Sequence, residues 1–190
     1  ESNINEQVNL IKNILRSYGY YNVELQTSLT NNDNNTVDLT YEVNLGQIAK
    51  IKKIKFIGNK VFRDNTLRNI IISEEAKFWK FITKNKFLDI NRVNADVFRL
   101  KNFYKNRGFF DVKIKSTTAV ITESNQFELI FNINAGNKFY FNSIQMSNNK
   151  NLEFEVLDQF AKKFENFEGK QYSKKKIDNL IDDLNDYTLR

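Results

Sequence analysis

The chain of 190 residues contains no cysteine, no histidine and no proline. Without cysteine and histidine, the chain has no thiolate nucleophile, no Cys/His zinc site, no Ser-His-Asp triad and no imidazole base. The longest apolar runs, such as the isoleucines at 70–72, are far shorter than the roughly 18 to 20 residues of a membrane-spanning helix. Any catalysis would depend on Asp, Glu, Lys, Ser or Tyr, and we expect no cofactor.

Charge and composition indicate a basic chain that can bury a core. Lysine and arginine number 29 against 23 aspartates and glutamates, a formal charge of +6, and the sequence pI is near 9.3. Lysine, asparagine and isoleucine are frequent throughout, so we interpret the bias as genomic and not as one basic site. The first residues, ESNINEQ, lack both parts of a signal peptide, and we expect a piece of a longer protein.

One stretch of sequence occurs twice, about ninety residues apart. Residues 11–25 read IKNILRSYGYYNVEL and residues 100–114 read LKNFYKNRGFFDVKI, the pattern of a helix, a glycine, two aromatics and a strand. A second strand that ends in glycine follows each copy, at 36–46 (TVDLTYEVNLG) and 126–136 (QFELIFNINAG). Repetition at a fixed period predicts a tandem array of one small unit.

Glycines are expected to mark the same turns in each copy. Gly19 and Gly108 are 89 residues apart and directly follow a helical pattern, where a left-handed glycine commonly ends a helix. Gly46 and Gly136 are 90 residues apart and close the last strand of each copy. Gly58 is expected to turn the chain after a further strand.

The predicted fold class is α+β, made of tandem β-α-α-β-β repeats. Each repeat is expected to be a three-stranded mixed sheet covered on one face by two helices, a stable two-layer solution for so small a domain. Helices are predicted from apolar stripes at helical spacing at 4–18, 90–104 and 177–187. The chain then divides into the C-terminal part of one repeat (1–46), a complete repeat (47–136) and the N-terminal part of the next (137–190), with a strand at 139–146.

Several passages resemble POTRA domains, the polypeptide-transport-associated repeats of the Omp85 superfamily. They are FIGN at 56–59, FYKNRGFFDVKIKS at 103–116 and FELIFNINAGNKFYF at 127–141. Residues 77–81 (KFWKF) are similar to the third POTRA domain of alphaproteobacterial BamA-type outer-membrane protein assembly factors. The resemblance covers essentially the whole chain and implies parts of POTRA 2, all of POTRA 3 and part of POTRA 4.

The resemblance implies that the second strand of each unit lies at a sheet edge, where an extended peptide can pair with the backbone. The implied docking edges are residues 20–27 and 109–116. The partner-binding residues, mainly through their backbone, are then Tyr20, Tyr21, Asn22, Val23, Glu24 and Leu25 in the first copy and Phe109, Phe110, Asp111, Val112, Lys113 and Ile114 in the second.

The same resemblance implies a non-enzymatic scaffold on the periplasmic side of the bacterial outer membrane, with this fragment itself soluble. Its implied partners are unfolded outer-membrane β-barrel proteins, accessory lipoproteins of the assembly complex and the C-terminal β-barrel of its own full-length chain. No small-molecule substrate is expected. A POTRA module of another Omp85-type translocation or secretion protein is the alternative within the superfamily.

The side chains of these passages are predicted to be mostly structural. Alternation along the second edge predicts that Phe110, Val112 and Ile114 face the core, so the backbone is the expected binding element. The aromatic residues of 77–81 are expected to pack beneath the loop between the two helices, with a partner-facing cluster as the alternative.

Two other classes of function have weaker support. A KH-like nucleic-acid-binding protein would share the basic pI and the β-α-α-β core, but it needs a G-x-x-G clamp that the chain lacks. Adjacent carboxylates such as Asp182 and Asp183 point in different directions on a helix, and no phosphate-binding glycine motif occurs. We therefore expect neither an enzyme nor a nucleic-acid partner.

Overall fold

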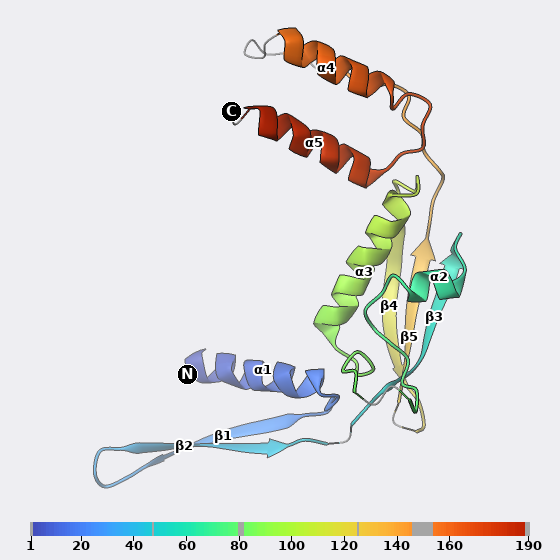
Figure 1. The fold of residues 1–190 in the computed structure, drawn as a ribbon. Coiled ribbons are helices and arrows are strands. Elements are labelled where there is room, and N and C mark those ends of the chain that lie inside the picture. Colours follow the sequence, from blue (N-terminus) through green and yellow to red (C-terminus); the bar gives the residue numbers. More distant parts are fainter. Residues whose placement is uncertain (1, 47, 80–81, 125, 146–153, 189–190) are drawn as a thin grey trace.

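The computed structural model describes residues 2–46, 48–79, 82–124, 126–145 and 154–188. Figure 1 shows three groups of elements along the chain: α1 with β1 and β2, then α2 and α3 with β3, β4 and β5, then α4 with α5. The elements are α1 (Ser2–Ser17), β1 (Glu24–Asn31), β2 (Val37–Asn44), β3 (Ile51–Asn59), α2 (Asp64–Arg68), α3 (Ile90–Lys105), β4 (Lys113–Ile121), β5 (Phe127–Asn134), α4 (Phe154–Glu165) and α5 (Lys174–Thr188).

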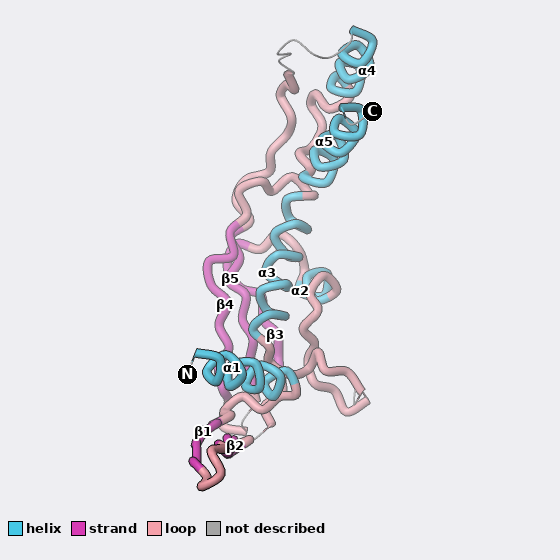
Figure 2. Tube along the Cα trace, turned by 90° about the vertical axis from the view of Figure 1, so that its left-hand side faces the viewer, coloured by secondary structure: helices cyan, strands magenta, loops and turns pink. Residues whose placement is uncertain are grey.

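The middle group contains a three-stranded mixed sheet in the order β3-β5-β4. β5 pairs in parallel with β3, with Ile54 opposite Leu129 and Phe56 opposite Phe131. On its other side β5 pairs antiparallel with β4, with Ala119 opposite Leu129. Both helices of the group lie on one face of the sheet (Figures 1 and 2). The predicted α+β class and β-α-α-β-β order are confirmed.

The face of β5 beneath the helices forms the core. Phe127, Leu129, Phe131 and Ile133 are only 0 to 2% exposed, while the residues between them are half-buried on the open face. This alternation follows because a strand directs successive side chains to opposite faces and only one face is covered here. Helix residues that complete the core are Leu67 from α2 and Val93, Leu100, Phe103 and Tyr104 from α3.

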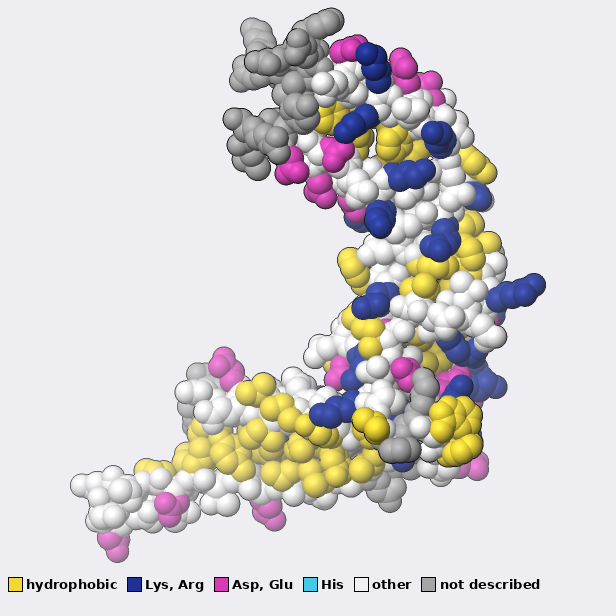
Figure 3. Space-filling view, in the orientation of Figure 1, with side chains coloured by type: hydrophobic (Ala, Val, Ile, Leu, Met, Phe, Trp, Pro, Cys, Tyr) yellow, Lys and Arg dark blue, Asp and Glu magenta, His cyan; other side chains and the backbone are white. Residues whose placement is uncertain are grey.

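The first group repeats only part of this arrangement. β1 and β2 form a two-stranded antiparallel sheet. Val37, Leu39, Tyr41 and Val43 of β2 stand 90 residues before the four buried residues of β5. Nevertheless, Val37 is 55% exposed and Val43 41% exposed, and Figure 3 shows a broad apolar surface over α1 and the β1–β2 hairpin. Within the described residues, no parallel strand lies beside β2 as β3 lies beside β5.

The last group is a pair of helices. Phe160 and Phe164 of α4 are buried, and Lys163 of α4 forms an ion pair with Asp183 of α5 at 2.7 Å. The strand predicted at 139–146 is wrong for the described residues 139–145, which form one isolated bridge and no strand; residue 146 lies outside the described residues. A strand requires continuous pairing, and no described strand lies beside this segment.

A backbone hydrogen bond at the end of each long helix joins one group to the next. Gly19 after α1 and Gly108 after α3 have φ angles of 96° and 90°, which let the chain leave the helix in a left-handed turn. The carbonyl oxygen of Gly19 accepts from the N–H of Ala49 at 2.8 Å, and that of Gly108 accepts from the N–H of Phe139 at 2.8 Å. The two junctions between groups, which we call the first and the second joint, are therefore held by the same type of backbone hydrogen bond.

Gly58 also meets a packing requirement that its sequence context does not predict. It lies inside β3, with φ of 88°. A Cβ at this position would stand 2.4 Å from the carbonyl oxygen of Ile133 in β5. The glycine is therefore required by the close approach of two paired strands.

Replacing Gly19 with alanine should loosen the first joint. A left-handed conformation costs an L residue about 1 to 2 kcal/mol, and the new Cβ would stand 2.5 Å from Cδ1 of Phe87. We expect the Ala49 N–H to exchange with solvent about tenfold faster or more, measured by NMR hydrogen exchange. Gly169→Ala is the control, because Gly169 also has a positive φ, of 67°, but nothing within 4 Å of the new Cβ. Unchanged exchange at Ala49 would contradict this role of Gly19.

Candidate functional site

β4 is paired on one side only. It hydrogen-bonds to β5, and no other described strand lies along its outer edge. Most of its residues are exposed, including Val120 at 46% and Ile121 at 50%. A register shift between Ile114 and Ser116 leaves Lys115 as a bulge, and a bulge strengthens the local twist of a strand. From Ser116 onward β4 is a regular strand with an open edge.

The register of β4 shows which of its residues face the open edge. Thr122 N–H donates to Gln126 O at 2.7 Å, just beyond the paired strands. In an antiparallel pair, bonded and non-bonded positions alternate, so the bonded positions are Ser116, Thr118 and Val120. The N–H and C=O groups of Thr117, Ala119 and Ile121 therefore point away from β5, and they are available to another strand.

A pocket of about 430 Å³ opens beside this edge. Its walls come from α1, from the start of α3, and from β4 and β5, so it lies where the first and middle groups meet. The lining is mostly apolar, with Arg16 as its cationic side chain. The lining residues are Asn13, Arg16, Tyr21, Leu88, Asp89, Ile90, Asn91, Val93, Thr117, Ala119 and Leu129.

The wall formed by α3 is held in place at the N-terminus of the helix. The Asp89 carboxylate accepts from the Arg92 N–H at 2.8 Å and caps the helix. The Arg92 guanidinium donates to the carbonyl oxygen of Phe87 at 2.9 Å. Asp89 therefore has a structural partner, and within the described residues no group of three or more acidic side chains is arranged to hold a metal ion.

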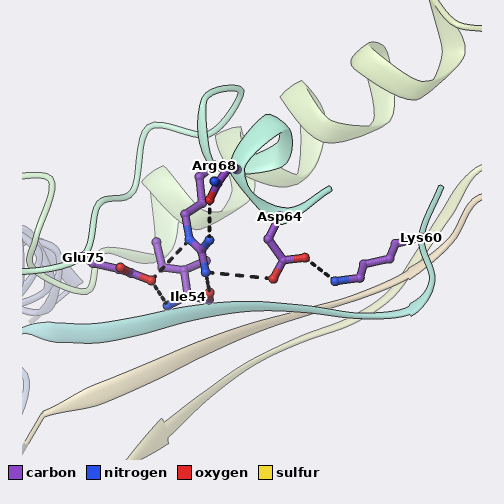
Figure 4. A network of polar contacts seen from close by, with 6 residues as sticks. Ile54, Lys60, Asp64, Arg68 and Glu75 are labelled. Carbon is purple, nitrogen blue, oxygen red and sulfur yellow. Dashed lines mark hydrogen bonds and ion pairs between the residues drawn. The ribbon is translucent and has the colours of Figure 1, made fainter. Parts of the chain in front are cut away.

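The opposite edge of the sheet is closed. In β3 the Ile54 N–H donates to Glu75 Oε1 at 3.0 Å, and the Ile54 carbonyl accepts from Arg68 Nη2 at 2.8 Å. Arg68 Nε lies 3.3 Å from Glu75 Oε1, so the two side chains bind each other as well as the strand (Figure 4). They occupy the donor and acceptor that a neighbouring strand would use at Ile54.

Backbone groups from the loop between α2 and α3 close this edge at Ile51 as well. The Ala76 N–H donates to the carbonyl oxygen of Ile51 at 2.8 Å, and the Ile51 N–H donates to the carbonyl oxygen of Lys86 at 2.7 Å. Both ends of the loop are therefore fixed to β3. The first half of β3 is therefore closed at Ile51 and Ile54, while β4 has an open edge.

The residues predicted to form the first docking edge lie mostly before the strand. Tyr20 forms an isolated bridge with Ile48, and the Tyr21 ring packs against Phe127 with centroids 5.0 Å apart. Asn22 lies in a turn and Val23 is buried. Of the six residues named for this edge, Glu24 and Leu25 belong to a strand, and with residues 26 and 27 of the predicted range 20–27 they begin β1.

The second predicted docking edge begins four residues too early. The first half of the predicted range 109–116, Phe109 to Val112, precedes β4, and the second half, Lys113 to Ser116, lies in it. The predicted inward position of Phe110 is wrong, because Phe109 and Val112 are buried while Phe110 is 48% exposed. The Phe109 N–H donates to Tyr104 O at 3.1 Å, which is the bond of a helix-ending turn, so the strand alternation starts later.

The open-edge residues Thr117, Ala119 and Ile121 were missed by sequence reasoning. A usable signal was present, because STTAVI (116–121) is rich in β-branched residues and ends at the turn TESN (122–125). The predicted packing of the aromatic loop residues is also wrong. Phe78, Trp79 and Ile82, which we call the apolar tip, are 89%, 58% and 86% exposed; Phe81 lies outside the described residues.

These features define a class of protein: a tandem array of small α+β units in which the complete unit keeps one sheet edge open. A family model described as "POTRA: Surface antigen variable number repeat" matches residues 1–46 and 49–136, more than half of the chain. The chain therefore belongs to the POTRA family, and this membership replaces the KH-like alternative.

The relatives are outer-membrane assembly factors. BamA of Neisseria meningitidis is 24% identical over 152 residues, which cover 80% of this chain and 19% of the relative. BamA of Neorickettsia risticii is 25% identical over 126 residues, covering 66% of this chain and 17% of the relative. The chain thus spans about a fifth of the length of these relatives.

A solved structure shares the fold. The crystal structure of POTRA domains 3 to 5 of Haemophilus influenzae BamA matches with a TM-score of 0.55 and 16% identity, and the match covers 95% of this chain and 69% of that one. At this identity the likeness shows the shared fold, and the sequence similarity is to BamA proteins. No described helix is long and apolar enough to cross a bilayer.

Glu75→Ala should open the β3 edge and destabilise the complete repeat. The change leaves the Ile54 N–H without its acceptor and removes the closer of the two ion pairs of Arg68, which keeps Asp64 at 4.0 Å. The expected cost is about 1 to 3 kcal/mol in the free energy of unfolding. Urea denaturation followed by circular dichroism measures this loss.

Two variants test the specificity of this effect. Glu75→Gln keeps an oxygen acceptor and should lose less stability than the alanine variant. Glu128→Ala removes the ion pair with Lys55 on the open face of the sheet, where the hydrogen bond from Lys55 lowers the pKa of the Glu128 carboxyl. It should also cost less than Glu75→Ala, and an equal cost would count against edge closure.

Proposed function

We propose that the chain is a periplasmic scaffold of outer-membrane protein assembly that binds unfolded β-barrel proteins as an added strand at the edge of β4. The observation that carries this proposal is the difference between the two edges of the sheet. At Ile51 and Ile54 of β3, side chains and loop backbone occupy the groups that another strand would use. At β4 no described strand does so, and three successive outward positions are available.

The backbone of β4 suits clients of many sequences. Thr117, Ala119 and Ile121 each offer one donor and one acceptor, so an extended peptide can form up to about six main-chain hydrogen bonds. Each such bond contributes about 0.5 to 1.5 kcal/mol net, and ordering of the peptide offsets much of the sum. Binding of this kind is weak and tolerates changes of sequence, as transfer of many different unfolded proteins requires.

The pocket beside β4 adds a side-chain preference. Thr117 and Ala119, whose backbone groups face outward, also line the pocket. A peptide paired with them would place alternate side chains over a surface formed by Ile90, Val93 and Leu129. We expect apolar side chains at these positions, in the alternating pattern of membrane β-barrel strands.

The wider arrangement is part of the same proposal. Residues 1–46 would end one repeat, 47–136 would form the complete one, and 137–190 would begin the next. The full-length protein would continue to a C-terminal β-barrel and bind accessory lipoproteins. The names of the relatives favour an assembly factor over another Omp85-type translocation or secretion protein.

Proline at Ala119 should block peptide binding without unfolding the sheet. The Ala119 N–H points away from β5, so proline removes a donor that only the peptide would use. The ligand is a synthetic ten-residue strand of an outer-membrane β-barrel, titrated by NMR. In the wild-type chain we expect amide shifts at Thr117, Ala119 and Ile121 larger than those in 127–134, with Kd of about 0.1 to 1 mM. Ala119→Pro should abolish these shifts.

Val120→Pro is the matched control. The Val120 position is bonded to β5, so this proline should lower the stability of the repeat, measured by circular dichroism. If the peptide instead shifts the amides of β3 and β5 as much as those of β4, or binds Ala119→Pro with unchanged affinity, the open edge of β4 is not the binding site.

A further inference from the structure

The apolar tip lies on the loop between α2 and α3, which projects on the β3 side of the sheet, away from β4 (Figure 2). Phe78 is 89% exposed, Ile82 86% and Trp79 58%. The rings of Phe78 and Trp79 pack edge to face with centroids 4.5 Å apart, and neither belongs to the hydrophobic core. The tip therefore presents three large apolar side chains to solvent.

The tip is exposed although the repeat around it is complete. The three strands, α2 and α3 are in place, and the ends of the loop are held to β3 by the bonds of Ala76 and Lys86 with Ile51. No element of this repeat is missing that could cover the tip. Exposed apolar side chains on a braced loop contribute nothing to the core, and such a patch marks a surface that meets something else.

The charge around the tip has one sign. Residues 76–87 contain four lysines and no acidic residue; Lys77 and Lys84 are exposed, Lys86 is buried, and Lys80 lies outside the described residues. Lys77 Nζ lies 5.5 Å from the centroid of the Trp79 ring. The nearby Glu75 is already paired with Arg68. The loop thus combines apolar side chains with positive charge.

We propose that the apolar tip inserts into the interfacial region of a lipid bilayer that carries anionic headgroups. An indole ring prefers the boundary between water and hydrocarbon. Phe78 and Ile82 supply apolar area beside it, and Lys77, next to the Trp79 ring, supplies positive charge to meet the anionic headgroups. A protein partner is a poorer match, because a stable interface needs roughly 800 Å² from each side, far more than three side chains of one loop provide.

The position of the tip makes this contact compatible with peptide binding. The tip is on the closed β3 side of the sheet and the open edge is on the β4 side (Figure 2). A membrane held at the tip leaves the β4 edge uncovered. The inference uses no residue of the open edge, so the two proposals can fail independently.

Trp79 is the chain's single tryptophan, so intrinsic fluorescence reports on the tip alone. The 190-residue chain is mixed with vesicles of phosphatidylglycerol and phosphatidylethanolamine, or of phosphatidylcholine. We expect a blue shift of the emission and reduced iodide quenching with the anionic vesicles, and much weaker effects with phosphatidylcholine. Absence of a shift with the anionic vesicles, or equal shifts with both, overturns the proposal.

Variants distinguish insertion of the apolar tip from electrostatic adsorption of other parts of this basic chain to the vesicles. The double variant Phe78→Ser/Ile82→Ser keeps Trp79 as the fluorescent reporter. It should lower the partition coefficient between anionic vesicles and water about tenfold or more. Phe98→Ser is the matched control, since Phe98 is 64% exposed on α3, outside the tip, and it should partition like the wild-type chain. Equal partitioning of the double variant and the wild-type chain overturns the proposal, and circular dichroism verifies that the variants fold.

Discussion

The arrangement of the complete repeat depends on β5, the strand that is paired on both sides. Phe127, Leu129, Phe131 and Ile133 fix its inner face beneath the helices, and its backbone is bonded to β3 on one side and β4 on the other. Once β5 is central, β3 and β4 must both be edges. Whether an extended peptide can pair with β3 or with β4 then depends on what covers each strand, and the two strands differ in this respect.

Hydrogen bonding explains why an edge can be closed or open at little cost to folding. Outward groups of β4 are solvated, so leaving them without a protein partner carries no desolvation penalty. At β3 the loop partly covers the strand, and groups removed from water need partners. Glu75 and Arg68 supply them at Ile54. The backbone hydrogen bonds are therefore satisfied in both cases, by water at β4 and by protein groups at Ile54 of β3. The edges differ in whether their backbone groups are available to an added strand.

The elements with a clear period were predictable from sequence, and those shaped by turns were not. β5 and α3 followed from strict alternation and from the stripe at 90–104. β4 was placed too early because Phe110, Val112 and Ile114 alternate like a strand, while residues 109–112 form the turns that follow α3. The closed edge was not predictable, because Glu75 and Arg68 meet Ile54 only through the fold, and no local pattern links them.

Exposed apolar residues mean different things in the first and middle groups. Val37 and Val43 of β2 are exposed, although their counterparts in β5 are buried by α2, α3 and β3. Within the described residues of the first group, no elements cover β2 in the same way. Phe78, Trp79 and Ile82 are exposed in a repeat that has all its strands and helices. The first surface consists of strand positions whose counterparts in β5 are covered, while the second lies on a loop outside the hydrophobic core of its own group. The two surfaces therefore have different physical origins.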